Sequence, residues 1–137
     1  MASILKVDAL QGVTAAGSIL VTGEGNSTTT NLQQGLAKLW CNWAGSATVN
    51  NSFNTASITD NGTGNFSVNT TNAFANVNYC RAGFAVNTAG TSGVLLDSTT
   101  TITQTDSTTV ISIEVNYLND GAVDGNRDEV IVHGDLA

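Results

Sequence analysis

The spacing of apolar residues changes along the chain. Between residues 30 and 43 it is helical, and one narrow helical stripe would hold four apolar residues: Leu32, Leu36, Leu39 and Trp43. These residues lie four, three and four positions apart, as in the alternating a and d positions of a heptad. Thr30 followed by Gln33 resembles a capping box. The pattern predicts a helix over about 30–43.

A helix of this length is marginal in isolation, so its stripe must pack on another surface. The stripe could cover the protein's own sheet, or it could pack on copies of itself about a symmetry axis. The narrow, heptad-like spacing favours the second arrangement. Leu32, Leu36, Leu39 and Trp43 are then the expected interface between subunits.

The region before this helix predicts an arm of short strands over residues 1–29. Residues 2–10 alternate as a strand would, and 19–21 form a second short apolar run after the turn-forming Gly17. Two short strands bury too little apolar area to fold alone. We therefore expect the arm to need a partner surface for attachment.

From residue 44 to 137 the apolar residues alternate with polar ones, and turn signals recur every eight to twelve residues. Asn61-Gly62 is the strongest hairpin signal, because tight hairpin turns need positive φ angles. The pattern predicts a mainly β, antiparallel, jelly-roll-like sandwich of about seven strands. The predicted core residues are Phe53, Ile58, Phe66, Val68, Tyr79, Phe84, Ile111, Ile113, Val115, Val130 and Val132.

Composition excludes several function classes. The net charge is −7, with only four basic residues in 137, so neither nucleic acid nor anionic lipid is an expected partner. No apolar run is long enough for a membrane span. The N-terminus lacks the order of a signal peptide, which predicts synthesis in a cytosol. Cys41 and Cys80 are therefore expected to be reduced.

Several segments resemble proteins of tailed bacteriophages, in particular marine cyanophage-like phages. Residues 3–8 (Ser-Ile-Leu-Lys-Val-Asp) and 29–38, running into Trp40, resemble their small virion proteins. Residues 52–66 are similar to the sandwich modules of their tail fibres, and 133–137 (His-Gly-Asp-Leu-Ala) to the usual end of such chains. The resemblance covers most of the chain, and its motifs are structural.

This resemblance implies a non-enzymatic, trimeric virion structural protein on the outside of the particle, made in the host cytoplasm. The heptad-like stripe fits a three-fold axis. The implied partners are copies of the chain, other virion proteins of the tail or capsid, and a host-surface glycan or receptor. No cofactor is implied. The chain lacks a recognisable tail adaptor and a fibrous shaft, so a capsid decoration protein that stabilises the head is the alternative to a tail fibre.

Catalysis has little support. The single histidine, His133, has no accompanying nucleophile motif, and we interpret it as a structural or interface residue. A polysaccharide-cleaving enzyme is therefore a distant third hypothesis. Trp40 and Trp43 could stack on sugars, although tryptophans on a helix are more often core residues.

An acidic loop near the C-terminus provides weak candidates for a metal site. Asp124, Asn126 and Asp128 are spaced like the first half of a calcium-binding loop. Glu129 occupies the position where glycine is needed, and no bidentate glutamate follows. We expect a solvated acidic turn, with a Ca²⁺ or Mg²⁺ site as the alternative.

Overall fold

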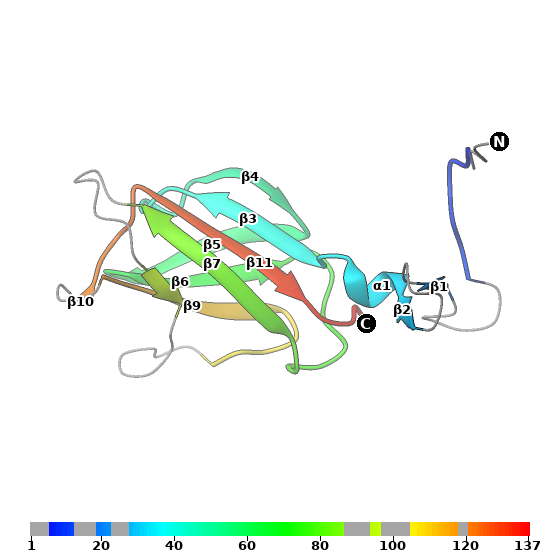
Figure 1. Ribbon diagram of the computed structural model, residues 1–137. Coiled ribbons are helices and arrows are strands. Elements are labelled where there is room, and N and C mark those ends of the chain that lie inside the picture. Colours follow the sequence, from blue (N-terminus) through cyan, green and yellow to red (C-terminus); the bar gives the residue numbers. More distant parts are fainter. Residues whose placement is uncertain (1–5, 13–18, 23–27, 87–93, 97–104, 118–120) are drawn as a thin grey trace. The chain divides into compact units, whose positions relative to one another are not determined.

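The structure is a computed structural model that describes residues 6–12, 19–22, 28–86, 94–96, 105–117 and 121–137. The chain divides into two compact units, Met1–Leu36 and Ala37–Ala137 (Figure 1). Each unit is described by itself below.

The N-terminal unit contains one small hairpin. Strand β1 (Leu20–Thr22) pairs antiparallel with β2 (Thr29–Asn31), which confirms the strand expected near residues 19–21. The single-turn helix α1 (Leu32–Gly35) follows, and its first amide donates to the carbonyl of Ile19 at 2.9 Å. Residues 6–10 form no strand, so the strand predicted over 2–10 is wrong there, while 2–5 lie outside the described residues.

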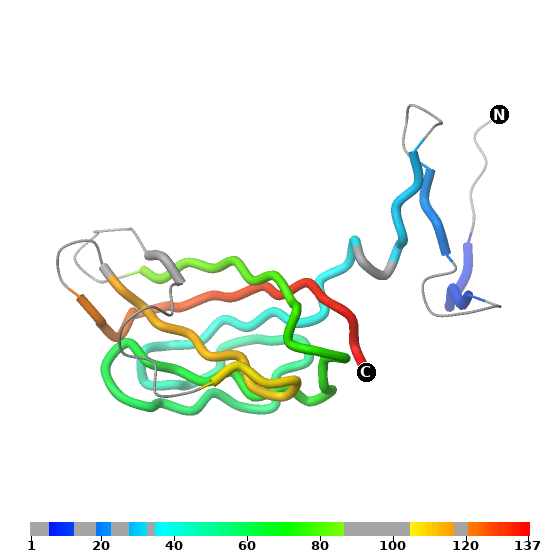
Figure 2. Tube along the Cα trace, turned by 90° about the horizontal axis from the view of Figure 1, so that it is seen from below, coloured from blue at the N-terminus to red at the C-terminus, as the bar shows by residue number. Residues whose placement is uncertain are grey.

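The C-terminal unit consists of two antiparallel sheets. One has the order β4 (Val49–Phe53), β3 (Leu39–Trp43), β11 (Arg127–His133) and β7 (Cys80–Val86). The other has the order β10 (Gly121–Ala122), β9 (Val110–Tyr117), β6 (Asn65–Thr70) and β5 (Thr55–Gly62), with β8 (Val94–Leu96) also paired to β9. Figure 2 shows β11 (red) running between β3 (cyan) and β7 (green). The mainly β, antiparallel fold with two facing sheets is thus confirmed.

The predicted hairpin at Asn61-Gly62 is present between β5 and β6. Gly62 pairs with Asn65, so the connection is Thr63-Gly64, and both glycines have positive φ. A Cβ at Gly64 would lie 2.6 Å from the carbonyl oxygen of Val115. The turn therefore needs glycine both for its backbone angle and for its contact with β9.

One apolar core fills the space between the sheets. The rings of Trp43 and Phe66 pack edge to face with centroids 5.9 Å apart, which links β3 to β6. Most of the predicted core is confirmed, with Ile58 and Tyr79 partly buried, but Phe53 and Phe84 are 50% and 70% exposed. The buried residues of this core are Leu39, Cys41, Trp43, Phe66, Val68, Phe74, Ala85, Ile111, Ile113, Val115, Val130 and Val132.

The helix predicted over 30–43 is wrong. Only Leu32–Gly35 is helical, and Leu39–Trp43 is the strand β3. Leu39, Cys41 and Trp43 also recur every second residue. All three pair with β11, and Cys41 and Trp43 also pair with β4 on the other side. Short apolar runs fit both periods. Burial between two sheets stabilises the strand more than an isolated helix containing Gly35 could be stabilised.

Candidate functional site

The four proposed interface residues do not form one stripe. Leu39 and Trp43 are completely buried inside the sandwich core, so they cannot meet another subunit. Leu32 and Leu36 belong to the other unit, where Leu36 is exposed and Leu32 half-buried. The predicted interface is therefore corrected: two of its members are core residues of a single chain.

The outer face of the four-stranded sheet carries several exposed large apolar side chains. Strand pairing aligns one residue from each strand in a row that crosses the whole sheet: Phe53, Trp40, Ile131 and Ala82. All four are classed as exposed, including Trp40 at 38% and Ile131 at 40%. We call this set the apolar row.

A second row, which we call the polar row, lies beside the apolar row and is displaced from it by two residues along each strand. It contains, from β4 to β7, Asn51, Asn42, Glu129 and Phe84.

Hydrogen bonds fix the middle of the polar row. The Asn42 amide donates to Glu129 Oε1 at 2.8 Å, while its own oxygen accepts from the Asn50 amide at 2.8 Å. The Arg127 Nε atom lies 2.9 Å from the same Glu129 oxygen. The amide and carboxylate groups are therefore oriented before any ligand arrives.

A groove lies where the two rows meet, over β3, β11 and β7. Its volume is about 360 Å³, which is at the lower end of the range for small-ligand sites. Small residues on β7 leave the hollow open, and its outward-facing side chains are Trp40, Asn42, Ala82, Phe84, Glu129 and Ile131. The groove combines aromatic walls with fixed polar groups.

The two tryptophans have different environments. Trp43 is fully buried, as expected for a core residue, whereas Trp40 lies on the outer face and lines the groove. Sequence reasoning treated both as helical and missed this difference. The alternation Leu39, Cys41, Trp43 was the signal that could have placed Trp40 on the opposite face.

The acidic loop does not gather its three candidate ligands around one point. Asp124 accepts the Gly64 amide at 2.7 Å, and the exposed Asn126 donates its backbone amide to Val86 at 2.7 Å. Asp128 points into the sandwich beneath Gly125, where an added Cβ would collide with its carboxylate. Across the described ranges, no group of three or more histidine, cysteine or acidic side chains is placed to hold a metal ion.

Asp128 is an unusual buried carboxyl group. It is 0% exposed, and neither oxygen has a hydrogen-bond partner in the part of the chain that the structure describes. Burial, and secondly the nearby Asp124, raises the pKa of Asp128 to about 7. A charged carboxylate without partners is costly in such a place, so the neutral form is favoured below about pH 7.

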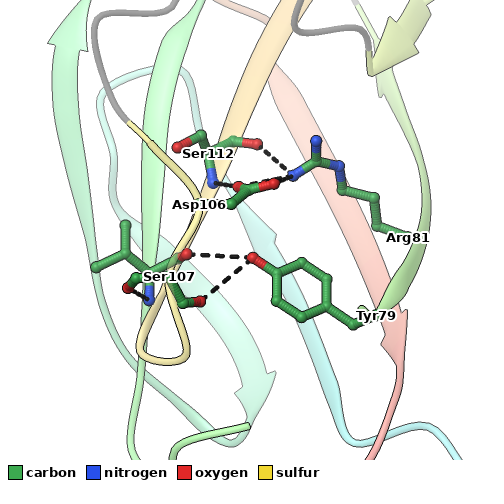
Figure 3. A network of polar contacts seen from close by, with 6 residues as sticks. Tyr79, Arg81, Asp106, Ser107 and Ser112 are labelled. Carbon is green, nitrogen blue, oxygen red and sulfur yellow. Dashed lines mark hydrogen bonds and ion pairs between the residues drawn. The ribbon is translucent and has the colours of Figure 1, made fainter. Parts of the chain in front are cut away.

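A polar network joins the two sheets at the β7–β9 edge (Figure 3). Arg81 Nη1 lies 2.9 Å from both Asp106 oxygens and donates to the Ser112 carbonyl at 3.0 Å. Asp106 in turn accepts the Ser112 amide at 2.8 Å. The network therefore satisfies both backbone groups of Ser112 with charged side chains, which points to a structural role.

Tyr79 lies beside this network. Its hydroxyl donates to the carbonyls of Ser107 and Val110 at 3.4 and 3.3 Å. Burial is the main cause that raises the pKa of Tyr79 to about 12, with a further contribution from Asp106. The hydroxyl therefore keeps its proton across the physiological range and serves as a donor to the backbone.

His133, the residue that a catalytic triad would need, ends β11 opposite Cys80. It lies half-buried near the end of the sheet and is not among the residues that line the groove. The interpretation of His133 as a structural residue stays a prediction.

No helix among the described residues of either unit is long and apolar enough to cross a membrane.

Comparisons of the chain with protein-family models, with curated proteins and with solved structures found no match.

Proposed function

We propose that this chain is a non-enzymatic virion structural protein of a tailed bacteriophage, which attaches to the particle through its N-terminal unit and presents its sandwich to the host surface. The bacteriophage assignment rests on the sequence resemblance. The observation that carries the division of labour is a contrast in burial between the two units.

No described residue of the N-terminal unit is buried, yet five apolar side chains there are exposed: Val7, Leu10, Leu20, Val21 and Leu36. The sandwich, in contrast, has a complete core of its own. Exposed apolar side chains on a small unit without a core indicate a surface that is covered in an assembly. The other virion proteins and further copies of this chain are the proposed partners.

A homotrimer is part of the proposal. The resemblance and the exposed apolar residues of the N-terminal unit support it, whereas Leu39 and Trp43 are buried in the core and do not. Leu36→Asp places a charge on this unit and should therefore dissociate the trimer, because buried carboxylates without partners are strongly unfavourable. Light scattering at micromolar concentration measures the subunit number, and a wild-type monomer there would contradict the trimer.

The attachment proposal is tested by deleting residues 2–21 and measuring incorporation into particles. The truncated chain should keep a folded sandwich, seen by circular dichroism and thermal unfolding, and should fail to join particles. The matched control changes the sandwich surface instead: Phe53→Ala should incorporate normally. Normal incorporation of the truncated chain would show that the sandwich makes the attachment.

Localisation on the particle, together with omission of the whole protein, separates the tail fibre from the decoration protein. A fibre should be found on tails, and its loss should reduce host adsorption. A decoration protein should be found on isolated tail-less heads, and its omission should leave adsorption intact while the heads become fragile.

A further inference from the structure

We propose that the groove on the outer face of β3, β11 and β7 binds a neutral carbohydrate, with Trp40 and Phe84 as stacking surfaces and Asn42 and Glu129 as hydrogen-bonding groups. This inference rests on the proposed function, because it names the class of host-surface ligand. It stands on the arrangement of the groove and on the charge of the chain.

The stacking surfaces are already exposed. Trp40 is 38% and Phe84 70% exposed, although aromatic side chains of this size are usually buried. They rise from β3 and β7, and β11 runs between them. Sugar rings present flat patches of C–H groups that pack on such aromatic faces, while the ring hydroxyls point sideways towards polar neighbours.

The polar groups have the chemistry that hydroxyls need. Glu129 accepts hydrogen bonds, and Asn42 offers both an amide donor and an oxygen acceptor. Their mutual hydrogen bond of 2.8 Å, with Asn50 and Arg127 behind it, orients both groups beside the apolar row. A site with apolar walls and a few fixed polar groups is typical of small-ligand recognition.

Charge selects the class of carbohydrate. Arg127 pairs with Glu129, the one acidic side chain among the residues that line the groove, and the chain as a whole carries a net charge of −7 with four basic residues. Acidic polysaccharides would meet unfavourable potential at this face. The ligand that fits is therefore a neutral oligosaccharide.

The same facts argue against a second copy of the chain as the occupant. The centres of protein interfaces are depleted in charged residues, whereas the polar row and the Arg127–Glu129 pair lie beside this groove. Self-association through this face is nevertheless measured as an outcome that would overturn the proposal.

The test is calorimetric titration of the full-length wild-type chain with a panel of neutral hexasaccharides: a β-1,4-glucan, an α-1,4-glucan, an α-1,6-mannan and a β-1,4-galactan. At least one should bind saturably with a millimolar or better Kd. Binding should also change the fluorescence of Trp40, while Trp43 is shielded in the core. Failure of every member of the panel to bind would overturn the proposal.

Variants then locate the binding. Trp40→Ala should weaken binding at least tenfold and Phe84→Ala at least fivefold. Phe84→Tyr, which keeps an aromatic ring, should retain most of the wild-type affinity. Phe53→Ala is the matched control, because Phe53 is exposed on the same face but does not line the groove, and its Kd should stay within twofold. Binding that survives both Trp40→Ala and Phe84→Ala would overturn the assignment, and should Trp40→Ala fail to fold, Phe84→Ala decides alone.

Light scattering of the same variants tests whether a second copy of the chain occupies the groove. If Trp40→Ala or Phe84→Ala lowers the subunit number, the face is a contact between copies and the carbohydrate proposal is overturned. Particle incorporation of the wild type is measured in parallel. A chain that incorporates but binds no sugar contradicts only this inference, whereas a chain that binds sugar but does not incorporate contradicts only the proposed function.

Discussion

Strand β3 has only five residues, yet its two faces differ completely. Leu39, Cys41 and Trp43 point into the core, and Trp40 and Asn42 point away from it. The two tryptophans lie three positions apart, a spacing that places side chains on the same side of a helix but on opposite sides of a strand. The type of element therefore decides whether this chain has two core tryptophans or one core tryptophan and one exposed tryptophan.

The largest effect should come from deleting the inner tryptophan. Trp43→Ala should lower the free energy of unfolding by about 3–5 kcal/mol, since it removes a fully buried ring and leaves a cavity. Trp40→Ala on the other face should cost roughly 1 kcal/mol or less, in the range of surface substitutions. Urea unfolding followed by circular dichroism measures both, and equal losses would show that the two faces are not distinct.

The next largest effect on stability should come from Asp128, a polar residue that is buried among the apolar side chains of the inner face. The pKa of Asp128 is raised from 3.8 to about 7 by burial, so between these values the folded chain holds a proton that the unfolded chain releases. The contribution of this group to stability is complete below about pH 4 and is lost as the pH rises to about 7, by about 1.4 kcal/mol for each pH unit.

Asp128→Asn should remove this dependence. The free energy of unfolding of the wild type, minus that of the variant, should fall as the pH rises from 4 to 7 and then level off. Thermal or urea unfolding at several pH values measures the difference. Asp135→Asn, at an exposed position, is the control and should show no such trend. A flat difference for Asp128→Asn would mean that the carboxyl is ionised and stabilised in the fold.

The sandwich was predictable from the sequence because its strands alternate clearly. Val110–Tyr117 has apolar residues at every second position, and Asn61-Gly62 indicated the hairpin between β5 and β6. The predicted type of element was wrong where the apolar run was short. Leu39–Trp43 fits both a helix and a strand, and only its pairing with β11, far along the chain, decides between them.

The groove could not be predicted for the same reason. Trp40, Glu129 and Phe84 are distant in sequence, and only the register of three strands brings them together. Phe84 was predicted as a core residue because it is large and apolar. Its strand, however, directs Arg81 and Ala85 inward, which leaves Phe84 on the outer face.

The two arginines on this sheet offer a smaller contrast between partly buried and exposed ion pairs. Arg81→Ala should lower the free energy of unfolding by about 1.5–3 kcal/mol, because it removes charged hydrogen bonds to Asp106 and leaves the Ser112 carbonyl without its donor. Arg127→Ala breaks the exposed pair with Glu129 and should cost less than about 1 kcal/mol. Urea unfolding of both variants at low and high salt measures the difference, and a larger loss for Arg127→Ala would contradict it.

The smallest effect on stability concerns the two cysteines, which also lie on opposite faces. Cys41 is buried on the inner face of β3 and Cys80 is exposed on β7, and both are free thiols. Strand β11 separates them in the sheet, so no disulfide can join them within one chain. Burial raises the pKa of the Cys41 thiol and so keeps it in the unreactive protonated form. Iodoacetamide should therefore add one group to the native chain, at Cys80, and two in urea, as counted by mass spectrometry, while reductant leaves the melting temperature unchanged. Two additions to the native chain would show that the inner face of β3 opens to solvent, and the contrast between the two faces would then be lost.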